Sequence, residues 1–485
     1  MDNYIVMIGL EMHCEISKTN AKVFSLSENS YEKEPNTNIG LRDMAFPGNL
    51  PVLNKKAVEL ALKTSIILGC KQPEYLYFER KHYFYPDLPG GYQVTQETKP
   101  LPVGIYGSFT FDSKGEEKTI RINNIHLEED AAASEHFDTF STIDYNRAGV
   151  PLLELVTEPD LRSADEAVSF LEAMRSIYQY ADISEADSKK GQVRCDVNIS
   201  IMDKNEDIND PNNWGTRVEI KNVNSFGGVR DAINYEVERH IEMKENGTYH
   251  ELEQQTRRWD EDTMTTKFMR SKEDAIDYRY FVEPNIPKYK IDPAWIKKIK
   301  SSIPELPNER KEKYINKFGL SNYDATVIVR EKDISDFYEE TIKLGGDVKK
   351  AANWLTSVIM GHLNKNDLEI KDIFITPAML IELMQMIEDG KISSKQSKEV
   401  FYKVLEEKKE PSKVVEESGM KQIGDDSMIR ELAIKVLDEN LHLIEEHRKG
   451  RNVFDFFVGQ IMKATRGQAN PTLTAEILRE EIDKR

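Results

Sequence analysis

The stretch TIRINNIHLEED, residues 119–130, decides the fold of the first half of the chain. It is typical of a β-strand, because Ile122, Ile125 and Leu127 favour extended backbone and no proline or glycine interrupts them. The strand ends in three adjacent carboxylates, which repel one another in water and are costly to bury. A strand of this kind therefore needs partners for its acids.

Strand alternation separates these acids onto two faces. Glu129 continues the apolar face that carries Leu127, whereas Glu128 and Asp130 point to the opposite side. Mid-strand acids recur in IGLEMHCEI (8–16), PLLELVTEP (151–159) and QVRCDVNIS (192–200). Since a buried carboxylate must be paired or bound to a cation, strands that each offer one predict a shared cavity.

These acids suit a hard divalent cation, which prefers oxygen ligands. The candidate ligands are Glu11, His13, Glu129, Glu154 and Asp196. The surplus of acids also allows two metal ions, an arrangement used to clamp a phosphoryl group during transfer. The alternative, that some of these acids lie on an exposed sheet face, stays open.

The composition favours a globular protein of two or three domains, with 485 residues and 39% hydrophobic residues. We expect no membrane span and no signal peptide. The three cysteines form no C-x-x-C pair, which favours a reducing, cytoplasmic location. The net charge of -19 argues against nucleic-acid binding by the whole surface. It does not exclude a local basic patch, and the stretch RKGRNVFDFFVGQIMKATRG (448–467) is rich in basic residues. This stretch is either a nucleic-acid contact or a solvated helix face.

The chain changes character near residue 290. Short alternating segments before that point predict an α+β domain on a mixed or antiparallel sheet, with helices over 54–68, 163–182 and 226–246. Ser163 and Glu166 form a predicted capping box. The pattern is then almost entirely helical. We predict domains at 1–293, 294–407 and 408–485.

The stretch FERKHYFYPDLPGGYQVTQ (78–96) combines aromatic side chains with Arg80 and Lys81 around a DLPGG turn. It is typical of a loop that lines a ligand site, where a cation faces phosphate, or of a hairpin that packs on the sheet. The sequence lacks the P-loop, the G-x-S-x-G elbow and the H-E-x-x-H zinc motif.

Motifs spread over the whole chain resemble one family. They include IGLEMHCEI, YFYPDLPGGYQVTQ, HLEEDA, RCDVNIS, QTRRWD and FFVGQIMKATRGQANP, in that order. These blocks look like the B subunits of tRNA-dependent amidotransferases. The resemblance implies a cradle domain related to glutamine synthetase, then a helical domain and a small helical tail domain of the YqeY type.

The resemblance also implies an activity. ATP phosphorylates the side-chain carboxylate of Glu on tRNA(Gln), or of Asp on tRNA(Asn), and ammonia displaces the phosphate. An A subunit supplies the ammonia from glutamine through a channel, and a small C subunit completes a cytoplasmic heterotrimer without a membrane anchor. The implied cofactors are ATP and Mg²⁺ or Mn²⁺. No zinc is expected, because residues 38–45 lack the cysteines that bind zinc in many members.

Site residues follow from the same resemblance. The implied metal ligands are Glu11, His13, Glu128, Glu129 and Glu154. The implied catalytic residues are Glu129, Lys81, Glu154 and Asp196, with Lys81 and Glu129 as a gate at the channel exit. The implied contacts to ATP or substrate are Arg80, Lys81, Tyr83, Asp87, Arg194, Asn198, Glu219, Lys221 and Arg279. The implied contacts to tRNA are Arg448, Lys449, Arg451, Lys463 and Arg466.

This chain departs from the family pattern at Gly90, Ala132, Ala133, Gln255, Val282 and Asn285. Two of these changes remove lysines near the phosphate region. Two alternatives therefore stay in view beside the amidotransferase. One is an altered paralogue that acts as a tRNA-binding scaffold, and the other is a stand-alone metal-dependent hydrolase or nuclease.

Overall fold

The structure is a computed structural model that describes residues 3–30, 33–96, 102–188, 190–223, 225–271, 277–418, 426–448, 453–465 and 469–485, without the side chains of 222, 445–448 and 471–472. The chain forms two compact units, Met1–Pro307 and Asn308–Arg485.

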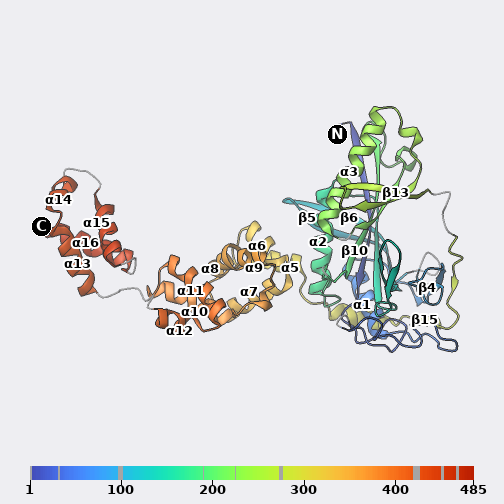
Figure 1. The fold of residues 1–485 in the computed structure, drawn as a ribbon, viewed down its shortest axis with the longest axis horizontal. Coiled ribbons are helices and arrows are strands. Elements are labelled where there is room, and N and C mark those ends of the chain that lie inside the picture. Colours follow the sequence, from blue (N-terminus) through green and yellow to red (C-terminus); the bar gives the residue numbers. More distant parts are fainter. Residues whose placement is uncertain are drawn as a thin grey trace. The chain divides into compact units, whose positions relative to one another are not determined.

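The first unit is built on an eight-stranded sheet (Figure 1). Its strands are β1 (Tyr4–Glu15), β5 (Gly104–Ser113), β6 (Glu116–Glu129), β9 (Pro151–Thr157), β10 (Val193–Asp203), β11 (Val218–Val223), β12 (Gln255–Asp260) and β13 (Thr265–Ser271). Their order is β13-β12-β11-β10-β1-β9-β6-β5. Among the described strands of this sheet, β11 and β12 pair in parallel and the other neighbours pair antiparallel, which agrees with the predicted mixed or antiparallel sheet.

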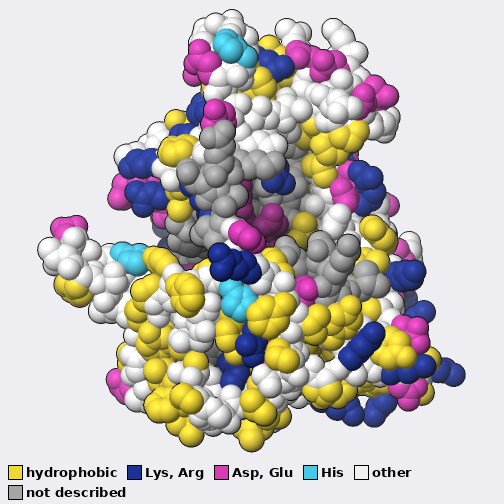
Figure 2. All heavy atoms as spheres, turned by 90° about the vertical axis from the view of Figure 1, so that its right-hand side faces the viewer, with side chains coloured by type: hydrophobic (Ala, Val, Ile, Leu, Met, Phe, Trp, Pro, Cys, Tyr) yellow, Lys and Arg dark blue, Asp and Glu magenta, His cyan; other side chains and the backbone are white. Residues whose placement is uncertain are grey.

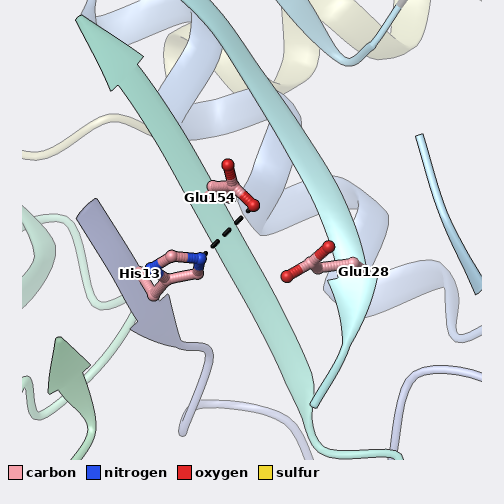
Figure 3. Close-up of side chains that lie close together, drawn as sticks. All are labelled: His13, Glu128 and Glu154. Atoms are coloured by element: carbon pink, nitrogen blue, oxygen red, sulfur yellow. Dashed lines mark ion pairs between the residues drawn. The ribbon is translucent and has the colours of Figure 1, made fainter. Parts of the chain in front are cut away.

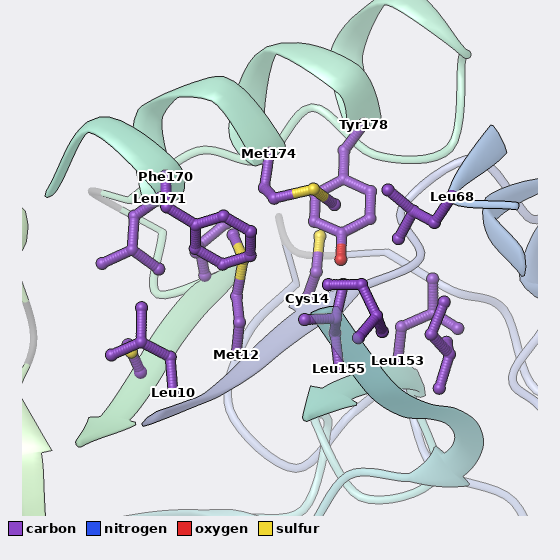
Figure 4. Packing of buried hydrophobic residues seen from close by; sticks show 14 of the residues in the cluster. Leu10, Met12, Cys14, Leu68, Leu153, Leu155, Phe170, Leu171, Met174 and Tyr178 are labelled. Atoms are coloured by element: carbon purple, nitrogen blue, oxygen red, sulfur yellow. The ribbon is translucent and has the colours of Figure 1, made fainter. Parts of the chain in front are cut away.

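One face of this sheet is apolar and covered by helices. The covering helices are α1 (Lys55–Ile67), α2 (Ala164–Tyr180) and α3 (Phe226–Glu245), and α4 (Pro293–Ser301) packs on α1. Figure 4 shows Met174 and Tyr178 of α2 lying over Met12 of β1 and Leu155 of β9. The helices pack against the apolar side chains of these strands, and the alternate, polar side chains project from the other face of the sheet.

The start of α2 shows how local sequence fixes a helix. The Ser163 side chain accepts a hydrogen bond from the backbone N–H of Glu166, as the capping box predicts. The Glu166 carboxylate, however, accepts from the backbone N–H of Arg162, one residue earlier than expected. The three predicted helices of this half are confirmed within one or two residues at each end.

Three small sheets flank the large one. They are β14 (Phe281–Val282), β3 (Glu79–His82) and β4 (Tyr92–Thr95); β15 (Tyr289–Lys290) and β2 (Tyr75–Leu76); and β7 (Ala133–His136) and β8 (Ser141–Asp144). The aromatic-rich stretch 78–96 thus forms a hairpin of β3 and β4, and β4 packs against β6.

The second unit is helical. Its helices are α5 (Pro307–Asn316), α6 (Asn322–Val329), α7 (Lys332–Lys343), α8 (Val348–Trp354), α9 (Met360–Asn366), α10 (Pro377–Glu388), α11 (Ser394–Glu407), α12 (Pro411–Ser418), α13 (Asp426–Asp438), α14 (Leu441–Arg448), α15 (Phe454–Ala464) and α16 (Pro471–Asp483). A π-helical segment, Leu355–Ile359, joins α8 to α9. A short 3-10 turn occurs in this unit at Ile370–Asp372, and two others occur in the first unit at Pro211–Asn213 and Tyr249–Glu251.

Hydrophobic cores bear on the predicted domain boundaries. Residues up to Ile299 join the first core, and α12 contributes Val414 and Val415 to the core of α5–α12. A separate core lies within α13–α16. The division at 293 and 407 stays a prediction, beside an observed division into units after Pro307. In the described residues, no helix is long and apolar enough to cross a bilayer.

A buried ionic network fixes α3 to the edge of the sheet. Glu236 is fully buried, with Arg239 at 2.7 Å, Arg257 at 3.2 Å and the His240 imidazole at 3.5 Å, and Thr266 donates to it. Burial acts to raise the pKa of Glu236, but the bonds from His240 and Arg239 outweigh it and lower the pKa to about 2.

This shift gives a pH-dependent stability. Because the folded pKa lies below the ordinary 4.5, the stabilisation is complete above pH 4.5 and is lost as the pH falls toward 2. We expect Glu236→Gln to lower the free energy of unfolding at pH 6, and the loss relative to wild type to shrink by about 1–2 kcal/mol at pH 3. Urea unfolding at both pH values measures this. The exposed Glu238→Gln on the same helix is the control, and an equal loss at both pH values for Glu236→Gln would contradict the prediction.

Candidate active site

A row of polar side chains crosses the open face of the sheet. His13 of β1 lies opposite Arg194 of β10 on one side and opposite Glu154 of β9 on the other. Glu154 in turn lies opposite His126 of β6. Directly opposed residues of antiparallel strands project to the same face, so main-chain pairing alone gathers these four side chains.

The first group of possible metal ligands lies in this row. His13, Glu128 and Glu154 each offer one ligand atom within 4.8 Å of the others (Figure 3). Oε2 of Glu154 lies 3.3 Å from Nε2 of His13 and 3.1 Å from Nε2 of His126. Glu128 accepts a hydrogen bond of 2.9 Å from the Thr95 hydroxyl of β4. Strands β1, β9 and β6 thus supply the three ligands.

Burial and opposite charges shift the pKa values of this group in different directions. Burial acts to lower the pKa of His13, but Glu154 outweighs it and raises the pKa to about 9. Burial acts to raise the pKa of Glu154, but His126 and His13 hold it well below its usual value. Burial and the charge of Glu154 raise the pKa of Glu128. Glu128 is therefore the acid of this group that gains most from an added cation.

A second group lies one row along the same face. Glu11, Asp196 and Glu219 offer ligand atoms within 4.8 Å of one another. Lys221 neutralises part of this charge, at 2.7 Å from Asp196 and 2.9 Å from Glu219. Asn198 donates a 2.8 Å hydrogen bond to Glu11. Burial is the main cause that raises the pKa of Glu11, and the negative charge of Glu154 raises it further. The two groups therefore interact electrostatically.

A cavity of about 470 Å³ opens beside the second group. Its lining includes Glu11, Asn198, Trp214, Arg217 and Gln254. The cavity therefore offers an indole ring and a guanidinium next to carboxylates, a combination suited to a ligand with a flat base and phosphates.

The donor sets of the two groups fit a hard divalent cation. The first has two carboxylates and one imidazole, and the second has three carboxylates beside an ammonium. Oxygen-rich sets of this kind suit Mg²⁺ or Mn²⁺. Figure 2 shows acidic side chains gathered in a recess near the middle of this side of the molecule. Apolar side chains spread below it.

Glu129 lies apart from both groups. As alternation predicts, it faces away from Glu128, and its carboxylate pairs with Arg42 at 3.3 Å and accepts a 2.9 Å hydrogen bond from the backbone N–H of Val94. The Lys81 ammonium instead lies 4.8 Å from the ring centre of Tyr278. A gate between Lys81 and Glu129 would require both side chains to change partners.

Other predicted ligand contacts border the same face or the hairpin. Arg194 donates a 2.7 Å hydrogen bond to Asp130, and its charge acts with that of Arg147 to lower the pKa of Asp130 against the effect of burial. Arg80 pairs with the buried Glu283.

The remaining predicted contacts lie along the hairpin and after it. Burial and the charge of Asp87 raise the pKa of Tyr83. Burial raises the pKa of Asp87, whose Oδ1 atom is buried without a hydrogen-bond partner in the structure. Arg279 is exposed.

Sequence reasoning missed three partners of these acids: His126, Thr95 and Arg42. A signal existed for His126, which shares the strand parity of Glu128 in the stretch HLEED. No comparable signal existed for the other two, because β4 and the 38–45 segment reach β6 only through tertiary packing.

The departures from the family pattern lie around the hairpin and at the sheet edge. Ala132 is buried, and its N–H donates to the backbone oxygen of Asp87. A Cβ on Gly90 would meet the Tyr92 ring at 3.3 Å. Gln255 accepts from Arg257 on β12. The other departures are Ala133 on β7, Val282 on β14 and Asn285, whose N–H donates to Glu283.

Of the predicted tRNA contacts, Lys463 is exposed on α15 and Arg448 ends α14. Lys449, Arg451 and Arg466 lie outside the described residues.

Comparison with known proteins identifies the family. A family model described as the GatB/GatE catalytic domain matches residues 6–297. The chain belongs to the GatB family. A second model, described as the GatB domain, matches residues 336–482. The predicted resemblance and the α+β fold are therefore confirmed.

GatB relatives match the chain from end to end. Proteins named as the B subunit of aspartyl/glutamyl-tRNA(Asn/Gln) amidotransferase, from Geobacillus thermodenitrificans and Oceanobacillus iheyensis, are 43% and 44% identical over 485 residues, which is 100% of each chain. The relative of that name from Bacillus cytotoxicus is 43% identical over the same length. These names accord with a GatB amidotransferase and give no support to the scaffold or hydrolase alternatives.

The ion pair between Arg42 and Glu129 gives a test of this geometry. Its side chains are only 16% and 8% exposed, so Arg42→Gln should leave a buried carboxylate with one hydrogen bond and lower the free energy of unfolding by about 1–3 kcal/mol. The control is Arg121→Gln, which breaks a pair with Asp160 in which Arg121 is 67% exposed and should cost less than about 1 kcal/mol. Urea unfolding of both variants measures the difference. Equal losses would contradict the assigned pairing.

Proposed function

We propose that this GatB chain carries out the phosphorylation and amidation steps of an aspartyl/glutamyl-tRNA(Asn/Gln) amidotransferase. ATP transfers its γ-phosphoryl group to the side-chain carboxylate of Glu on tRNA(Gln) or of Asp on tRNA(Asn). Ammonia then attacks the carbonyl carbon of the acyl phosphate; the C–N bond of the amide forms on the tRNA, the C–O bond to phosphate breaks, and inorganic phosphate and a proton are released. The observation that carries the proposal is the pair of acidic groups on the open face of the sheet, in a chain whose full-length relatives bear that name.

The reaction explains why acids gather there. A free carboxylate does not react with ammonia, so it must first become an acyl phosphate. Forming one brings the carboxylate against the phosphates of ATP, and both are anions. His13, Glu128 and Glu154 would hold Mg²⁺ or Mn²⁺, which neutralises this repulsion when bound. The raised pKa of Glu128 supports this assignment, because a nearby cation favours the charged form that burial disfavours.

The second group and its cavity suit the nucleotide. Trp214 offers a flat surface for a base and Arg217 a cation for phosphate, at the edge of the sheet face. Asn198 and Lys221 fix the carboxylates of Glu11 and Asp196 between this cavity and the first group. We assign the adenosine half of ATP to the cavity, with its phosphates directed toward His13.

The proposed partners follow from the reaction. An A subunit that hydrolyses glutamine supplies ammonia, a C subunit completes the complex, and the helical tail contacts tRNA. The -19 net charge of the chain makes a local contact by basic side chains necessary. Lys463 and Arg448 belong to that predicted patch, together with Lys449, Arg451 and Arg466.

Transamidation by the assembled complex tests the function. The chain is co-purified with its A and C subunits and supplied with ATP, Mg²⁺, glutamine and each mischarged tRNA in turn. We expect Gln-tRNA, Asn-tRNA or both, and the product names the substrate. Glu154→Gln should lower product formation at least about 100-fold while glutamine hydrolysis persists, because the cation loses its ligand. The control is the exposed Glu238→Gln. Absence of both products from wild type, or normal amidation by Glu154→Gln, would contradict the proposal.

Salt dependence tests the tRNA contact. A lysine that contacts one phosphate contributes about one unit to the slope of log affinity against log salt concentration. We expect Lys463→Ala to weaken binding of every tRNA alike and to lower that slope by about one unit. Filter binding over a salt series measures it. An unchanged slope would show that Lys463 does not contact the backbone.

A further inference from the structure

His126 has no role in the function derived above, although it lies at the centre of the site. Its ring is buried on β6, and its Nε2 atom lies 3.1 Å from Oε2 of Glu154. The same oxygen lies 3.3 Å from Nε2 of His13. Glu154 is thus held by an imidazole from each neighbouring strand, and only one of the two imidazoles belongs to the ligand group.

A chain of hydrogen bonds fixes the orientation of the His126 ring. Asn123 donates a 2.7 Å bond from Nδ2 to Glu158, and its own oxygen accepts a 2.8 Å bond from Nδ2 of Asn124. Since the amide nitrogen of Asn124 is committed there, its oxygen faces Nδ1 of His126 at 2.9 Å. An amide oxygen can only accept, so Nδ1 is the donor. The ring is therefore held with Nε2 toward Glu154.

This arrangement rests on strand positions that main-chain pairing already fixes. Asn124 lies opposite Val156, and His126 lies opposite Glu154, so the relay runs along β6 beside the strand that carries the ligand. Groups that hydrogen-bond to metal-binding carboxylates set ligand orientation, and their loss typically weakens metal binding about 10–100-fold.

We propose that Asn123, Asn124 and His126 form a positioning relay that orients the Glu154 carboxylate for a divalent cation. His126 donates from both ring nitrogens as the imidazolium, through Nε2 to Oε2 of Glu154 and through Nδ1 to Asn124, and the asparagines hold the ring in that orientation. The proposal rests on the cation site of the proposed function. It assigns no ligand role to His126, which acts through Glu154.

Two substitutions of His126 separate the roles of its ring nitrogens. Glutamine places an amide N–H near the position of Nε2, whereas asparagine places one near Nδ1. We expect His126→Asn to weaken Mn²⁺ binding about 10–100-fold and His126→Gln to retain binding within about threefold. Asn124→Leu should weaken it by an intermediate factor. The control is His250→Asn, the same change at a histidine that is 76% exposed.

The purified three-subunit complex is titrated with Mn²⁺ alone, and calorimetry measures the Mn²⁺ affinity. Thermal unfolding of each variant checks that it is folded. Transamidation by His126→Asn should also recover at higher Mg²⁺. Wild-type Mn²⁺ binding by both His126→Asn and Asn124→Leu would overturn the proposal. Equal losses for His126→Gln and His126→Asn would overturn it too, because the imidazole itself would then be required. If His126→Asn does not fold, Asn124→Leu and His126→Gln decide.

Failure of the inference is distinct from failure of the proposed function. Mn²⁺ binding needs neither tRNA nor amide formation, so the relay can be tested in a complex that makes no product. Conversely, if the relay variants bind Mn²⁺ normally and the complex still forms product, the proposed function stands and the relay proposal is rejected.

Discussion

The antiparallel register of β1 with β9 and β10 is the constraint on which the rest of the first unit depends. It places Glu11 beside Asp196 and His13 beside Glu154, and it turns Met12 toward the helices. Because side chains alternate, a slip of one residue would exchange these faces. The imidazole would then enter the apolar core, and the sulfur would take its place among the carboxylates. The same strand register thus produces both the packed core and the arrangement of the site residues.

Charge compensation sorts the buried acids into two kinds. Asp130 and Glu129 each have an arginine partner, Arg194 and Arg42 respectively, and are neutralised by the protein itself. Among the described residues, Glu128 accepts a hydrogen bond from the Thr95 hydroxyl, and the charges of His126, His13 and Lys81 offset the effect of burial only in part, so its pKa stays raised. A cation entering the site therefore gains most where the protein has left charge uncompensated. This difference, rather than the number of acids, indicates where a metal ion belongs.

Much of this was accessible from the sequence. Alternation correctly divided IHLEED into an apolar and a polar face and separated Glu129 from Glu128, but it did not predict the irregularity between Ile122 and Asn124, which lets Ile122 join the same core as Ile125. The strand pattern and the family resemblance both grouped Glu129 with the metal ligands, and the structure does not bring it to either group. Pairing partners such as Arg42 and Thr95 could not be predicted, because they come from segments without a periodic pattern that reach β6 through packing. His126 lies two residues before Glu128 and so projects to the same face, but the sequence reasoning searched for acidic side chains and did not select it.

The central position of β1 also governs the order in which the chain can fold. It is the first strand to be synthesised, yet its partners are residues 151–157 and 193–203. Until those residues emerge, both of its edges lack their hydrogen-bonding neighbours and its apolar face lacks α2. Pairings so distant in sequence form slowly and expose strand edges to other chains. A strand in the middle of the large sheet therefore waits for both of its neighbours, and nascent chains shorter than about 200 residues should depend on chaperones for their solubility.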